Sequence, residues 1–163
     1  MKYLTLIRHA KSDWSDATLN DFDRPLNKRG KKAAPLMGSR IAAAKDVPQL
    51  LVSSPAKRAC KTAQLIAKEL GVEQDDIRYH EEIFAAKDKH LIKLIRGFSA
   101  DRHIALIGHN PGLTDLGQWL CAEAPDWLPT CAVLTLKLDI HKWSELDKDC
   151  AQIISYDYPK KAR

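Results

Sequence analysis

Short apolar segments alternate with helical patterns along most of the chain, and this alternation constrains the fold more than any other feature. The segments are rich in β-forming residues, as buried strands are, and lie at 3–7, 49–54, 77–80, 103–108, 131–139 and 151–156. Helices are predicted between them at about 28–44, 55–70, 88–97 and from an Asn110 cap to about Cys121. Strands that alternate with helices predict an α/β fold, a three-layer α/β/α sandwich around a mostly parallel sheet.

Capping residues mark the ends of the first two predicted helices. Asn27 is expected to cap the first helix, and Pro35 is expected to kink it or to shift its start. Ser54 and Pro55 predict the N-cap and the first turn of the second helix, which should end at Gly71.

The composition fits one domain over residues 1–163, because 45% hydrophobic and 29% charged residues are typical of a globular protein. Arg8 interrupts the first apolar stretch, so no signal-peptide pattern develops, and no apolar run approaches the roughly 18 residues of a membrane span. We therefore expect a cytoplasmic protein with no membrane partner. The net charge of +5 is spread among many acidic residues, and no nucleic-acid partner is predicted from the short basic tail at Lys160, Lys161 and Arg163.

Residues suited to binding an anion follow three of the predicted strands. Arg8 and His9 follow the first strand, Arg58 lies one turn into the second helix, and His109 follows the strand at 103–108. In parallel sheets, ligands bind beyond the carboxyl ends of the strands, near helix N-termini. Guanidinium groups and helix N-termini both favour phosphate. The sequence therefore predicts an oxyanion pocket that holds a nucleophile.

Three motifs in this order resemble the signatures of the histidine phosphatase superfamily: LIRHAKS at 6–12, SSPAKRACKTA at 53–63 and GHNP at 108–111. Ala10 stands where the family usually has glycine. This departure, the DRPLNKRG stretch at 23–30 and the chain length resemble the small SixA-type phosphohistidine phosphatases. The resemblance implies a phosphoglycerate-mutase-like sandwich without a helical cap insertion.

The same resemblance implies a two-step phosphoryl transfer. His9 would attack phosphorus and form a phosphohistidine intermediate that water hydrolyses, while Arg8, Arg58 and His109 would hold the phosphoryl oxygens. Nearby arginines should help to keep His9 neutral. Ser12 could donate a hydrogen bond to phosphate or cap a turn. The scheme requires no metal and no cofactor, and phosphate or sulfate is expected to bind in the pocket.

Two further predictions concern groups around this pocket. The family usually supplies an acidic residue to protonate the leaving group; Glu82 fits that position best and Glu81 is the alternative, and at least one of the two is expected to be a solvated loop carboxylate. Arg24 could approach the site or pair with Asp21 or Asp23, and pairing is favoured.

The substrate is predicted from the connections between elements. Only residues 71–76 separate the second helix from the next strand, which leaves no room for a lid over the site. An open site suits a phosphoryl group on a protein surface better than an enclosed metabolite. The favoured substrate is phosphohistidine on a protein, for example a histidine phosphotransfer domain. The alternatives are a broad or small-molecule phosphomonoesterase and a non-catalytic phosphoprotein-binding module.

Overall fold

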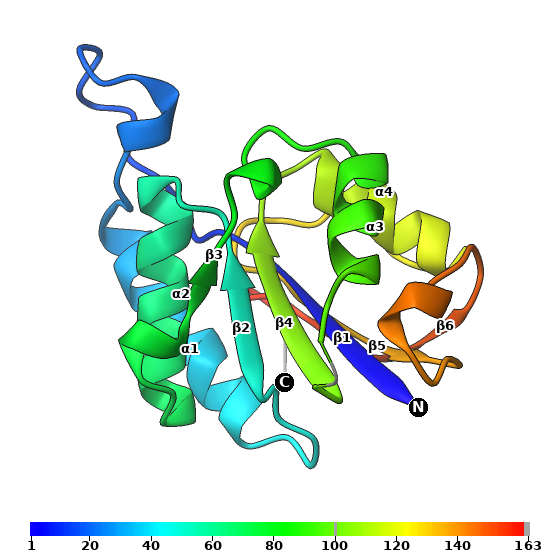
Figure 1. The fold of residues 1–163 in the computed structure, drawn as a ribbon. Helices are drawn as coiled ribbons and strands as arrows, with labels where there is room; N and C mark the ends of the chain where they lie inside the picture. The colour runs from blue at the N-terminus through cyan, green and yellow to red at the C-terminus, as the bar shows by residue number, and fades with distance from the viewer. Residues whose placement is uncertain (100, 162–163) are drawn as a thin grey trace.

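The computed structural model describes residues 1–99 and 101–161, and a sheet of six strands lies at its centre (Figure 1). The strand order is β3-β2-β4-β1-β5-β6, and the first four strands are mutually parallel while β5 and β6 are antiparallel to their neighbours. The strands are β1 (Lys2–Arg8), β2 (Leu50–Ser53), β3 (Arg78–Tyr79), β4 (His103–Gly108), β5 (Val133–Leu138) and β6 (Ala151–Asp157). The mostly parallel sheet is therefore confirmed.

Helices cover both faces of the sheet (Figure 1). One face carries α1 (Lys28–Ala42) and α2 (Lys57–Leu70), and the other carries α3 (Asp88–Arg96) and α4 (Gly112–Leu120). Single 3₁₀ turns lie in the connections: η1 (Asp21–Asp23), η2 (Gln74–Asp76), η3 (Glu81–Ile83) and η4 (Trp143–Glu145). This arrangement is the predicted α/β/α sandwich.

Successive side chains of the central strands point to opposite faces of the sheet, and this alternation produces two apolar layers. Leu4 and Leu6 of β1 pack with α3 and α4, whereas Ile7 packs with α1 and α2. In β4, Ile104 faces the first layer and Ile107 faces the second. All five side chains are fully buried, and each contributes about 1.5–3 kcal/mol by leaving water. Central strands covered on both faces read as continuous apolar runs for this reason.

The first helix begins where its cap predicts. The side chain of Asn27 accepts a hydrogen bond of 2.8 Å from the backbone N–H of Gly30, and α1 starts at the next residue, Lys28. Pro35 lies inside α1 and does not shift its start, because the Asn27 cap already fixes the first turn.

The second helix begins two residues later than its sequence predicts. Its N-cap is Ala56, not Ser54, and Pro55 precedes the helix. Ser54 Oγ instead accepts a hydrogen bond of 3.2 Å from the Ala56 N–H, which forms a short turn before α2. Gly71 ends the helix as predicted, with a left-handed φ of 71°.

The last helix also begins later than predicted, at Gly112. Asn110 still supports it, because Asn110 Oδ1 accepts hydrogen bonds from the N–H of Thr114 at 3.3 Å and from its hydroxyl at 2.8 Å.

The described part of the chain contains no helix that is both long and apolar enough to cross a bilayer. Of the basic tail, Lys160 and Lys161 are described, while Arg163 lies outside the described residues.

Candidate active site

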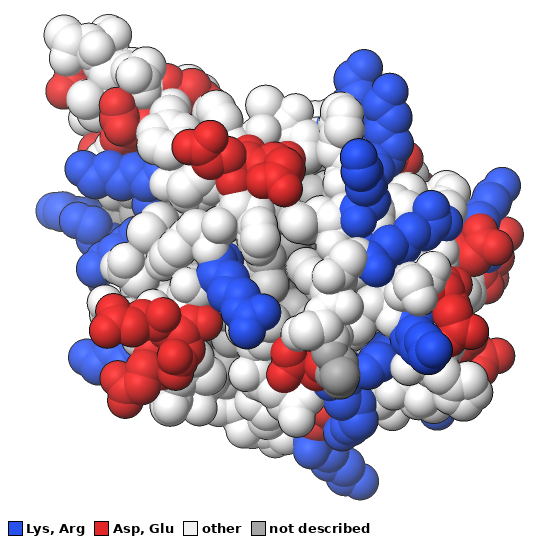
Figure 2. All heavy atoms as spheres, in the orientation of Figure 1, with Lys and Arg blue, Asp and Glu red and all other residues white. Residues whose placement is uncertain are grey.

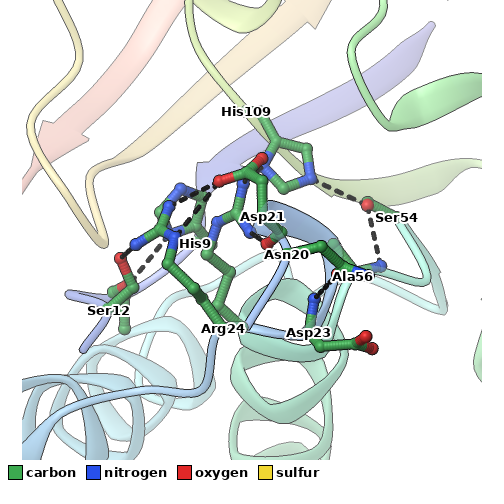
Figure 3. A network of polar contacts seen from close by, with 11 residues as sticks. His9, Ser12, Asn20, Asp21, Asp23, Arg24, Ser54, Ala56 and His109 are labelled. Carbon is green, nitrogen blue, oxygen red and sulfur yellow. Dashed lines mark hydrogen bonds and ion pairs between the residues drawn. The ribbon is translucent and has the colours of Figure 1, made fainter. Parts of the chain in front are cut away.

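The strand order brings together the three strand ends that precede the predicted anion-binding residues. β4 lies between β2 and β1, and the register pairs Arg8 with Gly108 and Ser53 with Ile107, so the three strands end side by side. A pocket of about 300 Å³ opens at this edge (Figure 3). Its lining residues are Arg8, His9, Lys11, Ser12, Trp14, Arg24, Arg58, His109, Asn110 and Thr130.

His9 follows β1 and is 6% exposed. Its Nδ1 lies 2.7 Å from the carbonyl oxygen of Ala10. A carbonyl can only accept, so Nδ1 carries the proton and Nε2 carries the lone pair. Burial lowers the pKa of His9 to about 3, and the positive charges of the pocket, including Arg58 and Arg8, add to the shift. The arginines act in the predicted direction, but burial is the larger cause. His9 is therefore neutral near pH 7.

Arg8 and Arg58 bring two guanidinium groups to the pocket. Arg8 Nη1 donates to the carbonyl of Leu128 at 3.1 Å, and Arg58 Nη1 donates to the carbonyl of Asp21 at 2.5 Å. Within the described residues, the Nε atoms of both arginines are buried and have no hydrogen-bond partner. Buried N–H donors without an acceptor are costly. An anion with several oxygens, such as phosphate, would supply acceptors for such groups.

His109 lies beside His9, with the two ring centroids 5.1 Å apart. Its Nδ1 faces Arg58 Nη2 at 3.4 Å, and its Nε2 lies 2.7 Å from Ser54 Oγ. Because a guanidinium only donates, Nδ1 is the acceptor and Nε2–H donates to Ser54. Burial, followed by the charge of Arg58, lowers the pKa of His109 to about 4. The sequence predicts Ser54 only as a helix cap, and this orienting contact is not apparent from it.

Asp21 contributes a carboxylate beside the pocket, and its contact with Arg58 is not apparent from the sequence. Its Oδ2 lies 3.1 Å from Arg58 Nη2. Its Oδ1 lies 2.9 Å from Arg24 Nη2, and Figure 3 shows Asp21 beside Arg24. Although burial opposes the shift, the hydrogen bond from Arg24 and the charge of Arg58 hold the pKa of Asp21 below its usual value. The side chain is 56% exposed. An ionised carboxylate thus bridges two pocket arginines from the loop between β1 and α1, which projects from the molecule at the upper left of Figure 1. The sequence indicated only the Arg24 contact.

Arg24 and Ser12 form a buried pair in the pocket wall. Arg24 is 7% exposed and Ser12 is 8% exposed, and Arg24 Nη1 donates to Ser12 Oγ at 2.6 Å. Arg24 pairs with Asp21 as favoured and also lines the pocket, so both sequence alternatives hold. The Ser12 hydroxyl accepts from Arg24 and retains its own proton for donation.

Glu82 and Glu81 are not brought into this pocket. Both belong to η3 and are exposed, and Glu82 lines a separate groove beside α3. Ile83 is buried and the Phe84 ring packs edge-on against His109 at 5.6 Å, so apolar side chains of this turn face inward and its carboxylates face solvent. The prediction that Glu82 belongs to the pocket is corrected on this point. Within residues 1–99 and 101–161, no group of three or more His, Cys, Asp or Glu side chains is arranged to hold a metal ion.

Two small residues lie behind the backbone that carries the pocket residues. Ala10 is fully buried in the layer under α1 and α2, and its N–H donates to Thr62 Oγ1 at 3.0 Å, which fixes the backbone that holds His9. At Gly30, an added Cβ would lie 2.2 Å from the carbonyl oxygen of Lys11. Glycine therefore allows the start of α1 to pack directly against the pocket loop.

Comparison with known proteins agrees with this geometry. Residues 4–84 match the family model of the histidine phosphatase superfamily, branch 1. An uncharacterised chloroplastic protein of Arabidopsis thaliana is 30% identical over 151 residues, which cover 87% of this chain and 69% of that protein. A structure assigned as the phosphohistidine phosphatase SixA of Agrobacterium tumefaciens is 28% identical, with a TM-score of 0.81, and the match covers 97% of this chain and 98% of that chain.

A structure of the protein histidine phosphatase SixA complexed with tungstate has the same fold, with a TM-score of 0.82 at 19% identity over 96% of this chain and 97% of that chain. The matching family model, the similarity to SixA structures over nearly the whole chain and the sandwich fold agree with one another. The chain belongs to the histidine phosphatase superfamily, a superfamily of phosphatases, and within it to the SixA-type branch.

Proposed function

We propose that this phosphatase removes the phosphoryl group from phosphohistidine on a protein, through a covalent intermediate on His9. The observation that carries the proposal is the state of His9. It is buried and neutral, its Nδ1–H is held by the Ala10 carbonyl, and among the described residues nothing hydrogen-bonds to Nε2. A histidine in this state has one nucleophilic nitrogen in a fixed orientation.

In the proposed reaction, the Nε2 lone pair of His9 attacks phosphorus while the P–N bond of the substrate breaks. The bonding electrons leave with the substrate imidazole, which takes up a proton from solvent water. Water then attacks the phosphoryl group on His9, releases inorganic phosphate and returns the neutral imidazole. Arg8, Arg58 and His109 surround the transferred group and stabilise its charge, which is the main catalytic requirement of phosphoryl transfer.

The carboxylate of Asp21 occupies donors of Arg58 and Arg24 that the phosphoryl oxygens need. Because the Asp21 side chain is more than half exposed, it can move into solvent as phosphate arrives. Ser12 and Arg24 then contribute further donors to the same oxygens.

The choice of phosphohistidine is supported by the lack of an acid in the pocket. No carboxyl group is among the described residues that line it, and Asp21 beside it is held ionised. An alkyl phosphate needs a proton donor for its alkoxide leaving group, whereas the labile P–N bond of phosphohistidine needs less assistance. We assign Glu82 no role in this reaction. The similarity to SixA phosphohistidine phosphatases supports the same choice.

The test is a substrate panel without added metal: phosphohistidine on a histidine phosphotransfer domain, phosphotyrosine, phosphoserine and sugar phosphates. We expect the highest kcat/KM for the phosphohistidine protein, and no turnover of it by the His9→Ala variant. Acid quenching should trap an acid-labile phosphoenzyme in the wild type only. A sugar phosphate as the best substrate would make this a small-molecule phosphomonoesterase, and phosphate binding without turnover would make it a phosphoprotein-binding module.

A further inference from the structure

Four aromatic side chains lie in or next to the pocket, and we call them the aromatic rim: Trp14, Phe22, Phe84 and Trp127. The Trp14 ring centroid lies 3.3 Å from the guanidinium carbon of Arg24, and the Trp127 ring lies 5.5 Å from that of Arg8.

The two phenylalanines close another side of the rim. The Phe84 ring packs edge-on against His109 at 5.6 Å, and Phe22 packs edge-on against Phe84 at 5.2 Å. Each of these aromatic rings therefore contacts a pocket residue or a neighbour in the rim.

The exposure of the rim tryptophans is unusual for this chain. Trp14 is 75% exposed and Trp127 is 55% exposed, whereas Trp143 is 2% exposed and Trp119 is partly buried. The chain has four tryptophans, so the two exposed ones both stand at the pocket. Large apolar rings left in water next to a functional pocket mark a surface that a partner covers.

A basic surface continues from one side of the rim. Lys11 lines the pocket and also a shallow depression that it shares with Lys28, Arg29 and Lys31 at the start of α1, where Asp13 also lies. The four cationic side chains are exposed. Figure 2 shows Lys and Arg side chains gathered at the left edge of the molecule, below the projecting loop and over the region where α1 begins in Figure 1.

We propose that the aromatic rim and this basic surface together form the docking site for a folded protein that carries the phosphohistidine. The partner would present apolar side chains next to its phosphohistidine and acidic side chains farther out, opposite Lys28 and Arg29. This inference rests on the proposed function and adds the surface that selects the protein. It follows from continuity, because Trp14 lines the phosphate pocket while Trp127 and Phe84 lie against the pocket residues Arg8 and His109, and from the complementary charge beyond the rim.

A small substrate makes less use of this surface. The pocket of about 300 Å³ has room for the phosphoryl group and its attached ring, while the basic depression is lined by α1 residues beyond the pocket. A protein substrate can contact the phosphate site and the start of α1 at the same time.

The test compares kcat/KM for a phosphohistidine-bearing histidine phosphotransfer domain with kcat/KM for free phosphohistidine. We expect the protein-to-amino-acid ratio to fall about tenfold in Trp127→Ala, since buried interface tryptophans are frequent binding hot spots. It should fall further in Trp14→Ala/Trp127→Ala, and several-fold in Lys28→Glu/Arg29→Glu. Ile154→Ala in β6 is the matched control, because Ile154 is 53% exposed on an edge strand that does not line the pocket. Its ratio should stay at the wild-type value.

An unchanged ratio in the rim variants would overturn the docking site while leaving the proposed function intact. Equal losses for both substrates would also overturn it, and would make the rim a subsite for small aromatic phosphates. Calorimetric titration of His9→Ala with the phosphorylated domain, with and without Trp127→Ala, tests docking apart from catalysis. If the wild type releases no phosphate but this titration shows rim-dependent binding, the proposed function fails and the docking site stands.

Discussion

Two buried histidines lie at opposite edges of the sheet: His9 follows the carboxyl end of β1, and His103 begins β4 at its amino end. Their hydrogen-bond partners differ. At the carboxyl end, His9 uses Nδ1 on the Ala10 carbonyl and keeps Nε2 available. At the amino end, His103 is 1% exposed and both of its nitrogens are engaged. Its Nδ1 lies 2.9 Å from Asp46 Oδ1, and its Nε2 lies 2.6 Å from Thr5 Oγ1.

The difference shows that burial alone does not mark a reactive histidine. Burial lowers the pKa of His9 and of His103 alike. Asp46 and Thr5 saturate the His103 ring, so this cluster can only stabilise the fold by tying the connection before β2 to β1 and β4. At the carboxyl end, the His9 ring has, within the described part of the chain, a hydrogen bond only at Nδ1 and shares its pocket with Arg8 and Arg58. The number of hydrogen-bond partners and the surrounding charge distinguish the proposed nucleophile His9 from His103.

The first prediction has the largest expected effect and concerns the pocket at the carboxyl ends of β1 and β4. Arg58→Ala should lower kcat/KM by about 10²–10³-fold, because the variant loses a donor to the transferred phosphoryl group. Arg102→Ala is the matched control: Arg102 pairs with Asp46 at 2.7 Å beside His103, and its loss should leave the rate near the wild-type value. Steady-state kinetics on an aryl phosphate measure both. A normal rate in Arg58→Ala would remove Arg58 from the pocket chemistry.

The second prediction tests the amino end. His103→Ala should lower the free energy of unfolding by about 1–3 kcal/mol, because the Asp46 carboxylate and the Thr5 hydroxyl lose a buried partner. Activity per folded molecule should be retained. Urea denaturation followed by circular dichroism measures the first quantity, and kinetics on the folded fraction measure the second. Wild-type stability combined with lost turnover would reverse the assignment of the two histidines.

The third prediction concerns the pH dependence of the free energy of unfolding, to which the buried histidines at both ends contribute. The folded-state pKa values of His9 and His109, about 3 and about 4, and the lowered pKa of His103 all lie below the unfolded value near 6.5. The unfolded chain therefore binds more protons, so stability is present above pH 6.5 and decreases as the pH falls below it, by up to about 1.4 kcal/mol per pH unit for each histidine.

Denaturant titrations between pH 7.5 and pH 4.5 measure this slope. The slope should be shallower in His9→Asn than in the wild type, because one buried neutral histidine is removed. An equal slope in the two proteins would mean that His9 is not buried in its neutral form.

The smallest expected effect concerns the carboxylate on the loop. Asp21→Asn should strengthen inhibition by inorganic phosphate or tungstate by about two- to fivefold, the scale of a partly exposed ion pair, because the competing negative charge on Arg58 and Arg24 is lost. Inhibition constants measure this change. Asp23→Asn is the neighbouring control on η1 and should leave them unchanged. Weaker inhibition in Asp21→Asn would instead show that Asp21 positions the two arginines.

Much of the candidate site could be predicted from sequence because it depends on regular structure. Arg8, His9 and His109 stand at strand ends that the apolar runs define, and Arg58 follows a recognisable helix start. Parallel strands bring such ends to one edge, so the sequence pattern already implied their meeting. The motif order made the superfamily recognisable for the same reason.

The loop residues were predicted less well. Asp21 was considered only as a partner of Arg24, Ser54 only as a helix cap, and Glu82 as a pocket acid. Loops lack the period of 2.0 or 3.6 residues that reveals which way a side chain points. The packing of Phe84 on His109, and of Phe22 on Phe84, sets the orientation of the turns at η1 and η3.

The sequence by itself therefore determined the α/β sandwich, the superfamily and the four groups at the strand ends, because periodicity and motif order are local properties. Only the tertiary structure decided which nitrogen of His9 is available, that Asp21 bridges Arg58 and Arg24, and that Glu82 lines a separate groove. These outcomes depend on which distant side chains compete for the same donors and the same buried space, and that competition is settled only when the whole chain is packed.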